Sequence, residues 1–353
     1  MVRSGARGPE ERRPVRVAVT GAAGLLGRSI TRYLVERGLE LRAIVRSEAQ
    51  GRALKVDRLV SIVTADILST SRLVSAFMGC DAVVHCAARV QPRGPAREFY
   101  VANVLGTKAV LEACREARVP RLVHISSQGV YDLDDARDGE LIDETSATES
   151  RPERRGAYSR TKLAAEHLLR RMSSTSPTPH VVILRPGALY GPDHVLGPGP
   201  LGTWLPHSGW GVAVGRLDTH LNFTHVDNVA EAVRLALCGD VPTGSTFNVV
   251  DDEDLTQEKY MRMLGQHILL VNPAWMRAAF WLAWAIVPGR FRHAVDPVRV
   301  AHATRNVAYS TRAARQRLGW SPVRAFAVKS ALGDSATSQR SVRSVPDSRP
   351  ENP

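Results

Sequence analysis

Residues 155–166, RGAYSRTKLAAE, place a tyrosine and a lysine four positions apart, at Tyr158 and Lys162. On a helix this spacing brings both side chains to one face. The chain has 42 Arg and only five Lys, so an ordinary surface cation here would be Arg. A phenol has a pKa of about 10, which a nearby ammonium lowers by stabilising the phenolate. We expect Tyr158 to exchange a proton with a secondary alcohol or ketone, and Lys162 to lower its pKa.

A second motif, TGAAGLLG, spaces Gly21, Gly24 and Gly27 three residues apart. It follows an apolar run and precedes a helical pattern. In such a motif the first glycine makes a tight turn, the second lets backbone approach a pyrophosphate, and the third lets helix and strand pack closely. The phosphates lie at the helix N-terminus. The motif predicts a dinucleotide site, and a merely structural turn is the alternative.

Two charged residues end the next strands. Arg46 stands where Asp or Glu usually holds an unphosphorylated ribose. A guanidinium suits a 2′-phosphate, which favours NADP over NAD, although a surface arginine would leave NAD open. Asp66 could accept a hydrogen bond from adenine or could cap the following helix.

A serine ends the fifth strand, in HISSQGVY. Doubly wound sheets bind their ligands at the carboxyl ends of strands. Ser127 could therefore orient a substrate oxygen toward Tyr158, although a lone serine here could equally be a turn residue.

Strand and helix patterns alternate through the first half of the chain, as in an α/β doubly wound parallel sheet of Rossmann type. A Gly- and Pro-rich loop follows residue 186, and such loops often shape substrate pockets. The predicted strands are 15–20, 41–46, 60–66, 81–88, 121–127 and 180–186, with helices at 103–117 and 157–172. Later elements are expected at 221–237, 245–250, 255–265, 274–287 and 310–318.

These patterns predict four parts. An NAD(P)-binding domain spans 14–186, and a smaller substrate lobe, interleaved with the sheet domain, spans 187–333. Polar tails, 1–13 and 334–353, are expected to be disordered.

Composition restricts the function class. The 353 residues carry a net charge of +12, but the cations are scattered and no nucleic-acid-binding motif is present, so no nucleic acid partner is expected. Cys80, Cys86, Cys114 and Cys238 form no CxxC, which predicts no metal site and a reduced, cytoplasmic protein.

Together these motifs resemble the extended short-chain dehydrogenases/reductases of the NAD-dependent epimerase/dehydratase superfamily, over residues 15–320. The resemblance implies a small-molecule substrate, with Ser127, Tyr158 and Lys162 as catalytic residues. His85 belongs to a strand motif and is expected to be structural. The matching motifs are TGAAGLLG, HCAA, NVLGT, ISSQGVY, YSRTK, LRPGALYGP and FTHVDNVAEA. Cofactor-lining positions are expected at Leu25, Ile67, Ala87, Ala88, Asn103, Pro186 and Gly187, besides the three glycines and Lys162.

Departures from the family narrow the reaction. Sugar dehydratases carry Asp-Glu after the catalytic residue, whereas this chain has Gln128 and Gly129, so dehydration is not expected. UDP-galactose 4-epimerases hold nucleotide phosphates with an Arg where this chain has Leu221, although Arg216 or His220 could compensate. A nucleotide-sugar epimerase or reductase is placed first, and a 3β-hydroxysteroid, sterol or lipid hydroxyl dehydrogenase second. A non-catalytic dinucleotide-binding protein is disfavoured because all three catalytic positions are filled.

Residues 268–292 form a tryptophan-rich, apolar segment. It is too short to span a bilayer. Packing within the lobe or at a homodimer contact is favoured, and peripheral membrane binding through 274–292 is the alternative.

Overall fold

The computed structural model describes residues 16–54, 58–90, 94–175, 179–192, 194, 196–199, 201–205, 208, 210–251, 254–265, 267–287, 301 and 304–326. The predicted tails, 1–13 and 334–353, lie outside the described residues.

Seven strands of the described chain form one parallel sheet in the order β12-β7-β5-β4-β1-β2-β3. The chain leaves β1 in one direction toward β2 and β3, and returns on the other side to β4. Ligands of doubly wound sheets bind beside such a reversal, at the carboxyl ends of the strands. The strands are β1 (Arg16–Thr20), β2 (Glu40–Val45), β3 (Val60–Thr64), β4 (Ala82–His85), β5 (Arg121–Ile125), β7 (His180–Pro186) and β12 (Ser245–Val249).

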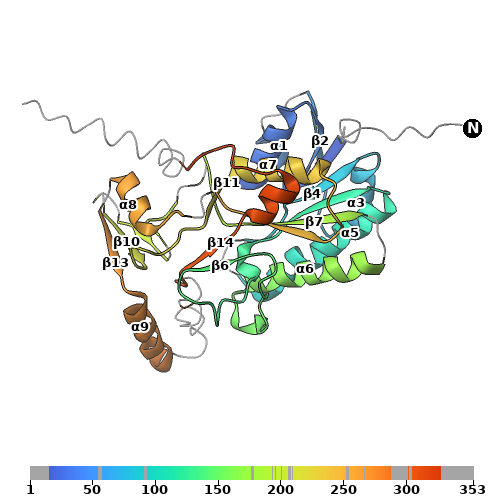
Figure 1. The fold of residues 1–353 in the computed structure, drawn as a ribbon. Helices are drawn as coiled ribbons and strands as arrows, with labels where there is room; N and C mark the ends of the chain where they lie inside the picture. The colour runs from blue at the N-terminus through green and yellow to red at the C-terminus, as the bar shows by residue number, and fades with distance from the viewer. Residues whose placement is uncertain are drawn as a thin grey trace, which may run out of the picture.

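Helices cover both faces of this sheet (Figure 1). One hydrophobic core joins the strands to α1 and α7, and a second joins them to α3, α5 and α6. Central strands are buried on both faces, which explains their continuous apolar sequences. The helices are α1 (Leu25–Val35), α2 (Glu48–Arg52), α3 (Thr70–Phe77), α4 (Ala96–Tyr100), α5 (Gly106–Glu116), α6 (Ala157–Thr175) and α7 (Val226–Cys238).

The predicted Rossmann-type sheet is confirmed, but several predicted bounds are wrong. The third, fourth and fifth strands end at Thr64, His85 and Ile125, two or three residues early. The chain leaves the strand ladder there and lines the end of the sheet. Asp66, Ala87, Ala88 and Ser127 therefore lie in loops beyond the strand ends. The helix predicted from 103 begins as a π-helix, Val101–Leu105, before α5.

The chain after residue 186 builds a smaller lobe and also completes the sheet domain. The parallel pair β8 and β11 begins the lobe, and β13, β10 and β9 form a three-stranded sheet. The hydrophobic core of this lobe includes Tyr190, Leu221, Phe223 and Tyr260. The remaining elements are β8 (Ala188–Tyr190), β9 (Thr203–Trp204), β10 (Trp210–Val214), β11 (Phe223–His225), α8 (Gln257–Leu264), β13 (His267–Val271), α9 (Pro273–Ile286), and the paired β6 (Glu140–Ile142) and β14 (Val307–Tyr309).

Candidate active site

The three glycines of the first turn have distinct surroundings. Gly21 has φ +69°, and a Cβ on it would lie 2.7 Å from Ala87 Cα. A Cβ on Gly27 would lie 2.1 Å from Gly21 O. Gly24 is open by comparison, with Gly21 O at 3.3 Å as the neighbour of its Cβ position. The first and third glycines are thus required by the turn itself, whereas the second leaves backbone accessible.

Backbone amides at this turn fit a phosphate group. Gly24 is the N-cap of α1 and has no side chain that could cap the first amide groups of the helix. The free N–H groups and the helix dipole favour an anion at this point. Leu25 is the first residue of α1, so its amide is one of these donors. The turn therefore fits the pyrophosphate of a dinucleotide.

The residues predicted to contact the adenosine end lie at the carboxyl ends of β2 and β3. Arg46 is exposed and its backbone N–H donates to Gln50 Oε1 at 3.0 Å. Asp66 Oδ1 accepts from the Leu68 amide at 2.9 Å, a local turn that leaves the second carboxylate oxygen for another donor. Ile67 lies against Gly106, where an added Cβ would be 3.3 Å from the isoleucine Cγ2. Asp66 therefore does not cap α3, whose N-cap is Ser69, and its expected contact with adenine stays a prediction.

Three predicted catalytic residues meet between β5 and α6. The Tyr158 phenol lies close enough to the Ser127 hydroxyl for that group to affect its pKa. Ser127 Oγ accepts from the Gly129 amide at 3.1 Å, which fixes the hydroxyl at the start of a short 3₁₀ turn. Lys162 is buried one helical turn after Tyr158, and its Nζ donates to Ile125 O at 2.7 Å. The arrangement places a hydroxyl donor, a phenol and an ammonium in one small region.

Burial governs the protonation of this group. It raises the pKa of the Tyr158 phenol, and the neighbouring Ser127 hydroxyl opposes that rise. Burial lowers the pKa of Lys162 to about 8, while Cys86 and Glu166 act in the opposite direction. The protein's own side chains therefore do not produce the lowered tyrosine pKa expected from the sequence. A cationic nicotinamide would add the positive charge that favours the phenolate.

A buried ion pair beside these residues joins α6 to β7. Glu166, one turn after Lys162 on α6, accepts from Arg185 Nε at 3.0 Å and from its terminal nitrogen at 2.6 Å. Ser126 donates to the same carboxylate at 2.5 Å. The network thereby joins the loop of Ser127 to the helix of Tyr158. Sequence reasoning missed it, and the available signal was a glutamate four residues after the lysine.

The remaining residues that were predicted to line the cofactor are held in position mainly by contacts within the protein. Asn103 is buried in the π-helix, and its side-chain amide bonds both Arg89 backbone groups and Thr161 Oγ1. It therefore joins the loop after β4 to α6. A Cβ on Gly187 would lie 2.2 Å from Asn222 O, so glycine is required where β7 meets the lobe. Pro186 ends β7 beside Val249, and Ala87 and Ala88 follow β4 in a half-buried loop.

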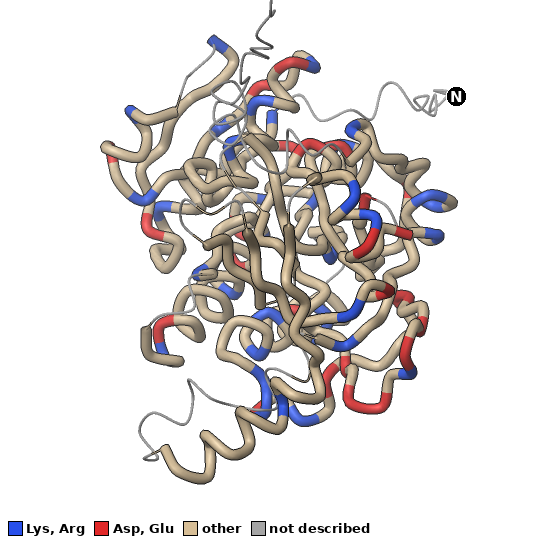
Figure 2. Tube along the Cα trace, turned by 90° about the vertical axis from the view of Figure 1, so that its left-hand side faces the viewer, with Lys and Arg blue, Asp and Glu red and all other residues tan. Residues whose placement is uncertain are grey.

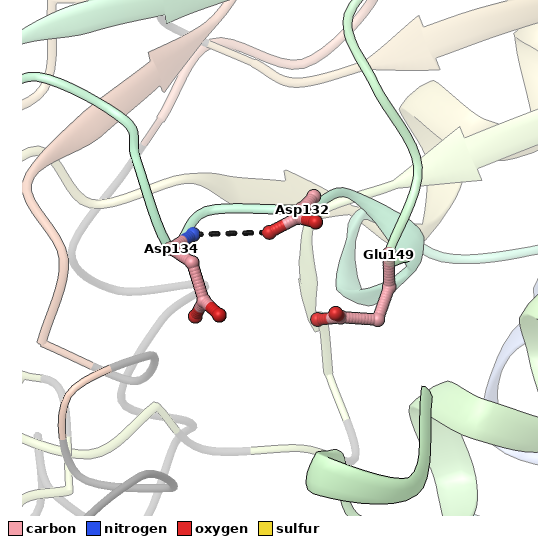
Figure 3. A group of neighbouring side chains, drawn as sticks. All are labelled: Asp132, Asp134 and Glu149. Carbon is pink, nitrogen blue, oxygen red and sulfur yellow. Dashed lines mark hydrogen bonds between the residues drawn. The ribbon is translucent and has the colours of Figure 1, made fainter. Parts of the chain in front are cut away.

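One group of carboxylates among the described residues is close enough to hold a metal ion: Asp132, Asp134 and Glu149 (Figure 3). Arg151 contacts Asp134 at 2.6 Å, and Arg155 contacts Glu149 at 3.0 Å. Arginines thus already balance much of the charge. Arg155 also donates to Gly129 O at 3.2 Å, so the group supports the loop that carries Ser127.

Two buried histidines lie beneath the site. His85 contacts Thr20 and Thr107 through its two ring nitrogens, at 2.8 and 2.9 Å, as a structural residue would. Its ring centroid is 5.2 Å from that of His124. Burial lowers the pKa of His85 from 6.5 to about 3, and it lowers that of His124 well below 6.5. Lys162 adds to both shifts by charge repulsion.

This pair predicts acid sensitivity. Below pH 6.5 the unfolded chain binds protons at His85 and His124, whereas the folded chain does not. The free energy of unfolding therefore falls as the pH falls toward about 3. Each histidine contributes up to about 1.4 kcal/mol per pH unit. Urea unfolding between pH 5 and pH 7 measures the slope, and His124→Phe should reduce it by about one proton. The same slope in both proteins would refute this account of His124.

Comparison with known proteins agrees with the fold. The profile of the NAD dependent epimerase/dehydratase family matches residues 17–249. The parallel sheet with a glycine-rich turn after β1 is that of an extended short-chain dehydrogenase/reductase. The chain belongs to the NAD-dependent epimerase/dehydratase family.

Its relatives include several ketone and alcohol oxidoreductases. A 4-hydroxy-2-methyl-3-oxo-4-farnesyl-3,4-dihydroquinoline-1-oxide ketoreductase of Stigmatella aurantiaca is 33% identical over 257 residues, covering 71% of this chain and 72% of that protein. A sterol-4-alpha-carboxylate 3-dehydrogenase, decarboxylating, of Dictyostelium discoideum is 26% identical over 75% of this chain and 84% of that protein.

Solved structures share the fold at lower identity. MoeE5 in complex with UDP-glucose and NAD has a TM-score of 0.66 at 21% identity, covering 93% of this chain and 99% of that one. The structure of gox2253 has a TM-score of 0.70 at 23% identity, with the same coverage.

Proposed function

We propose that the protein is an NAD(P)-dependent oxidoreductase that interconverts a secondary alcohol and a ketone on a largely apolar substrate. The observation that carries the substrate class is the state of three lobe positions that could have held nucleotide phosphates. Leu221 is buried in the lobe core. Arg216 is paired with Asp138 and Asp218. The His220 Nδ1 lies 2.8 Å from Asn306 Oδ1.

None of these three side chains is free for a diphosphate in this arrangement. Binding one there would require breaking an ion pair or a hydrogen bond, and each such loss opposes affinity. The sequence placed a nucleotide sugar first and a sterol or lipid alcohol second. Our proposal reverses this order. The nucleotide-sugar alternative keeps one point in its favour, the UDP-glucose bound to MoeE5, which shares the fold.

The names of the relatives also favour an apolar substrate. The names of the Stigmatella and Dictyostelium proteins describe a farnesyl-bearing ketone and a sterol carboxylate. A third relative, from Shewanella oneidensis, is a 2-alkyl-3-oxoalkanoate reductase, 30% identical over 70% of this chain and 64% of that protein. Each of the three names describes a reductase or dehydrogenase of a compound with a farnesyl, alkyl or sterol group.

The chain's own residues then divide the chemistry. Ser127 Oγ, fixed by the Gly129 amide, would donate to the substrate oxygen. Tyr158 would take the hydroxyl proton during oxidation and return it during reduction. The positive charge of the Lys162 ammonium would stabilise the Tyr158 phenolate. A bound nicotinamide dinucleotide would supply the hydride acceptor or donor. Gln128 and Gly129 lack the carboxylates needed to remove water, so a net dehydration is not part of the proposal.

A substrate panel tests the proposal. The purified protein is incubated with NAD or NADP and 3β-hydroxysteroids, and with NADH or NADPH and 2-alkyl-3-oxoalkanoates. Absorbance of the reduced nicotinamide is followed. UDP-glucose and UDP-galactose are tested in parallel, with epimer formation measured by NMR because that reaction gives no net reduction. Turnover of a UDP-sugar without turnover of any apolar substrate would overturn the proposal.

Cofactor choice has its own test. If Arg46 binds the 2′-phosphate, Arg46→Asp should lower the preference for NADPH over NADH by about ten-fold or more, because a charge-assisted hydrogen bond of about 1.5–3 kcal/mol is lost. Dissociation constants from fluorescence titration give the ratio. Arg52→Asp, the same charge change on α2, is the control and should leave it unchanged. Equal ratios in all three proteins would show that Arg46 faces solvent.

A further inference from the structure

Helix α9 (Pro273–Ile286) leaves the lobe beyond the end of β13 and carries no buried residue (Figure 1). The sequence favoured packing of this segment within the lobe or at a homodimer contact. Every side chain of α9 is partly or largely exposed, so the described lobe does not bury it, and the homodimer contact stays a prediction. Trp275 is 76% exposed, Leu282 66% and Ile286 74%. A helix in water normally turns polar residues outward.

Three of the four large apolar side chains that α9 exposes lie on one face, and the fourth, Trp281, lies outside that face. Trp275, Ala279, Leu282 and Ile286 follow a spacing of four, three and four, which forms a single stripe on a helix. Met276, Phe280, Ala283 and Trp284 lie on the other side and are only partly exposed. Arg277 is the one charged residue of the helix and lies away from the stripe. We call the four residues Trp275, Ala279, Leu282 and Ile286 the α9 stripe.

We propose that the α9 stripe docks the protein on an anionic lipid bilayer, with the helix lying in the plane of the interface. Such a helix inserts its apolar face at the boundary of headgroups and acyl chains, where tryptophan is favoured. Monomeric proteins rarely leave a continuous apolar face in water without a partner for it.

Charge selects the bilayer over a second copy of the chain. The protein carries a net charge of +12. From Lys259 to Val287 the sequence contains no Asp or Glu, and Figure 2 shows no acidic residue along the helix at the bottom of the view. An anionic surface attracts such a region, whereas two copies of the chain repel each other.

Length fixes the mode of binding. The 14 residues of α9 rise about 21 Å, less than the ~30 Å of a bilayer core. No helix among the described residues is long and apolar enough to cross a membrane. The geometry is therefore that of an interfacial helix. It does not depend on the substrate proposed above.

Flotation with vesicles tests the docking. The full chain is mixed with vesicles of phosphatidylcholine and phosphatidylglycerol at three to one, or of phosphatidylcholine alone. It should float with the anionic vesicles, less well in high salt because exposed charges are screened. Leu282→Asp with Ile286→Asp should lower the partition coefficient about ten-fold or more, and the fold should survive since both side chains contact solvent.

A charge-matched control separates the stripe from net charge. Met78→Asp with Val90→Asp alters two residues that are each 60% exposed on the sheet domain, and it should float like the unaltered protein. Absence of flotation, or equal flotation of the stripe variant, would overturn the proposal. So would a lipid-free dimer, seen by sedimentation velocity, that the stripe variant dissociates, because the stripe would then belong to a second copy.

Discussion

Replacing Tyr158 by phenylalanine is expected to lower kcat by about 10²–10⁴, the usual contribution of a positioned acid–base group. The ring and its packing remain, and the hydroxyl beside Ser127 is removed. Cofactor affinity should stay within about two-fold, since the phosphate-binding turn at Gly24 is untouched. Turnover is measured with whichever substrate the panel identifies, and affinity by fluorescence titration.

The control for this change is Tyr33→Phe. That residue donates its hydroxyl to a partner, Glu231 at 3.1 Å, but it lies at the contact of α1 with α7. The same chemical change there should leave kcat within about two-fold. Full activity of the Tyr158 variant would remove this residue from the mechanism and leave Ser127 and Lys162 without a proton acceptor between them.

The placement of the predicted catalytic pair on one helix was readable from sequence because helical spacing is local. Tyr158 and Lys162 share a helix, so four residues of separation decide that they share a face. Ser127 is 31 residues away and could be placed only through the rule that strand ends gather ligands. The glycines were readable for a similar reason, since close approach of backbone at Gly21 and Gly27 leaves no space for any other residue.

The parts that sequence reasoning missed depend on long-range contacts. The hydrogen bonds of the Asn103 side chain with Arg89 and Thr161 were not foreseen, and its expected place beside the cofactor stays a prediction. Burial decided the pKa of Tyr158, and no local spacing reports burial. Helix α9 has the apolar composition of a core helix, and only the fold shows that nothing in the described lobe buries it.

Breaking the Glu166–Arg185 pair is expected to have the largest effect on stability. The two side chains are 1% and 2% exposed, and Arg185→Met leaves the buried carboxylate with the Ser126 hydroxyl and the half-exposed Arg170, whose terminal nitrogen is 3.9 Å away. Removing one partner of a buried pair costs about 3–5 kcal/mol, because the remaining charge is desolvated without compensation. Arg262→Met is the matched control. Its pair with Glu258 has the same 2.6 Å separation but is 74% and 46% exposed, so its loss should cost about 0–1 kcal/mol.

A double-mutant cycle separates the pair from simple packing. Glu166→Leu with Arg185→Met removes both charges, so it should be several kcal/mol more stable than the sum of the single changes implies. Urea denaturation gives all four free energies of unfolding. If the losses in the free energy of unfolding are additive, the two side chains stabilise the protein through packing and not through their charges. Because Glu166 follows Lys162 on α6 and bonds Ser126 beside Ser127, Arg185→Met should also lower kcat in the protein that remains folded. A folded variant with normal kcat would show that the site holds its geometry without this pair.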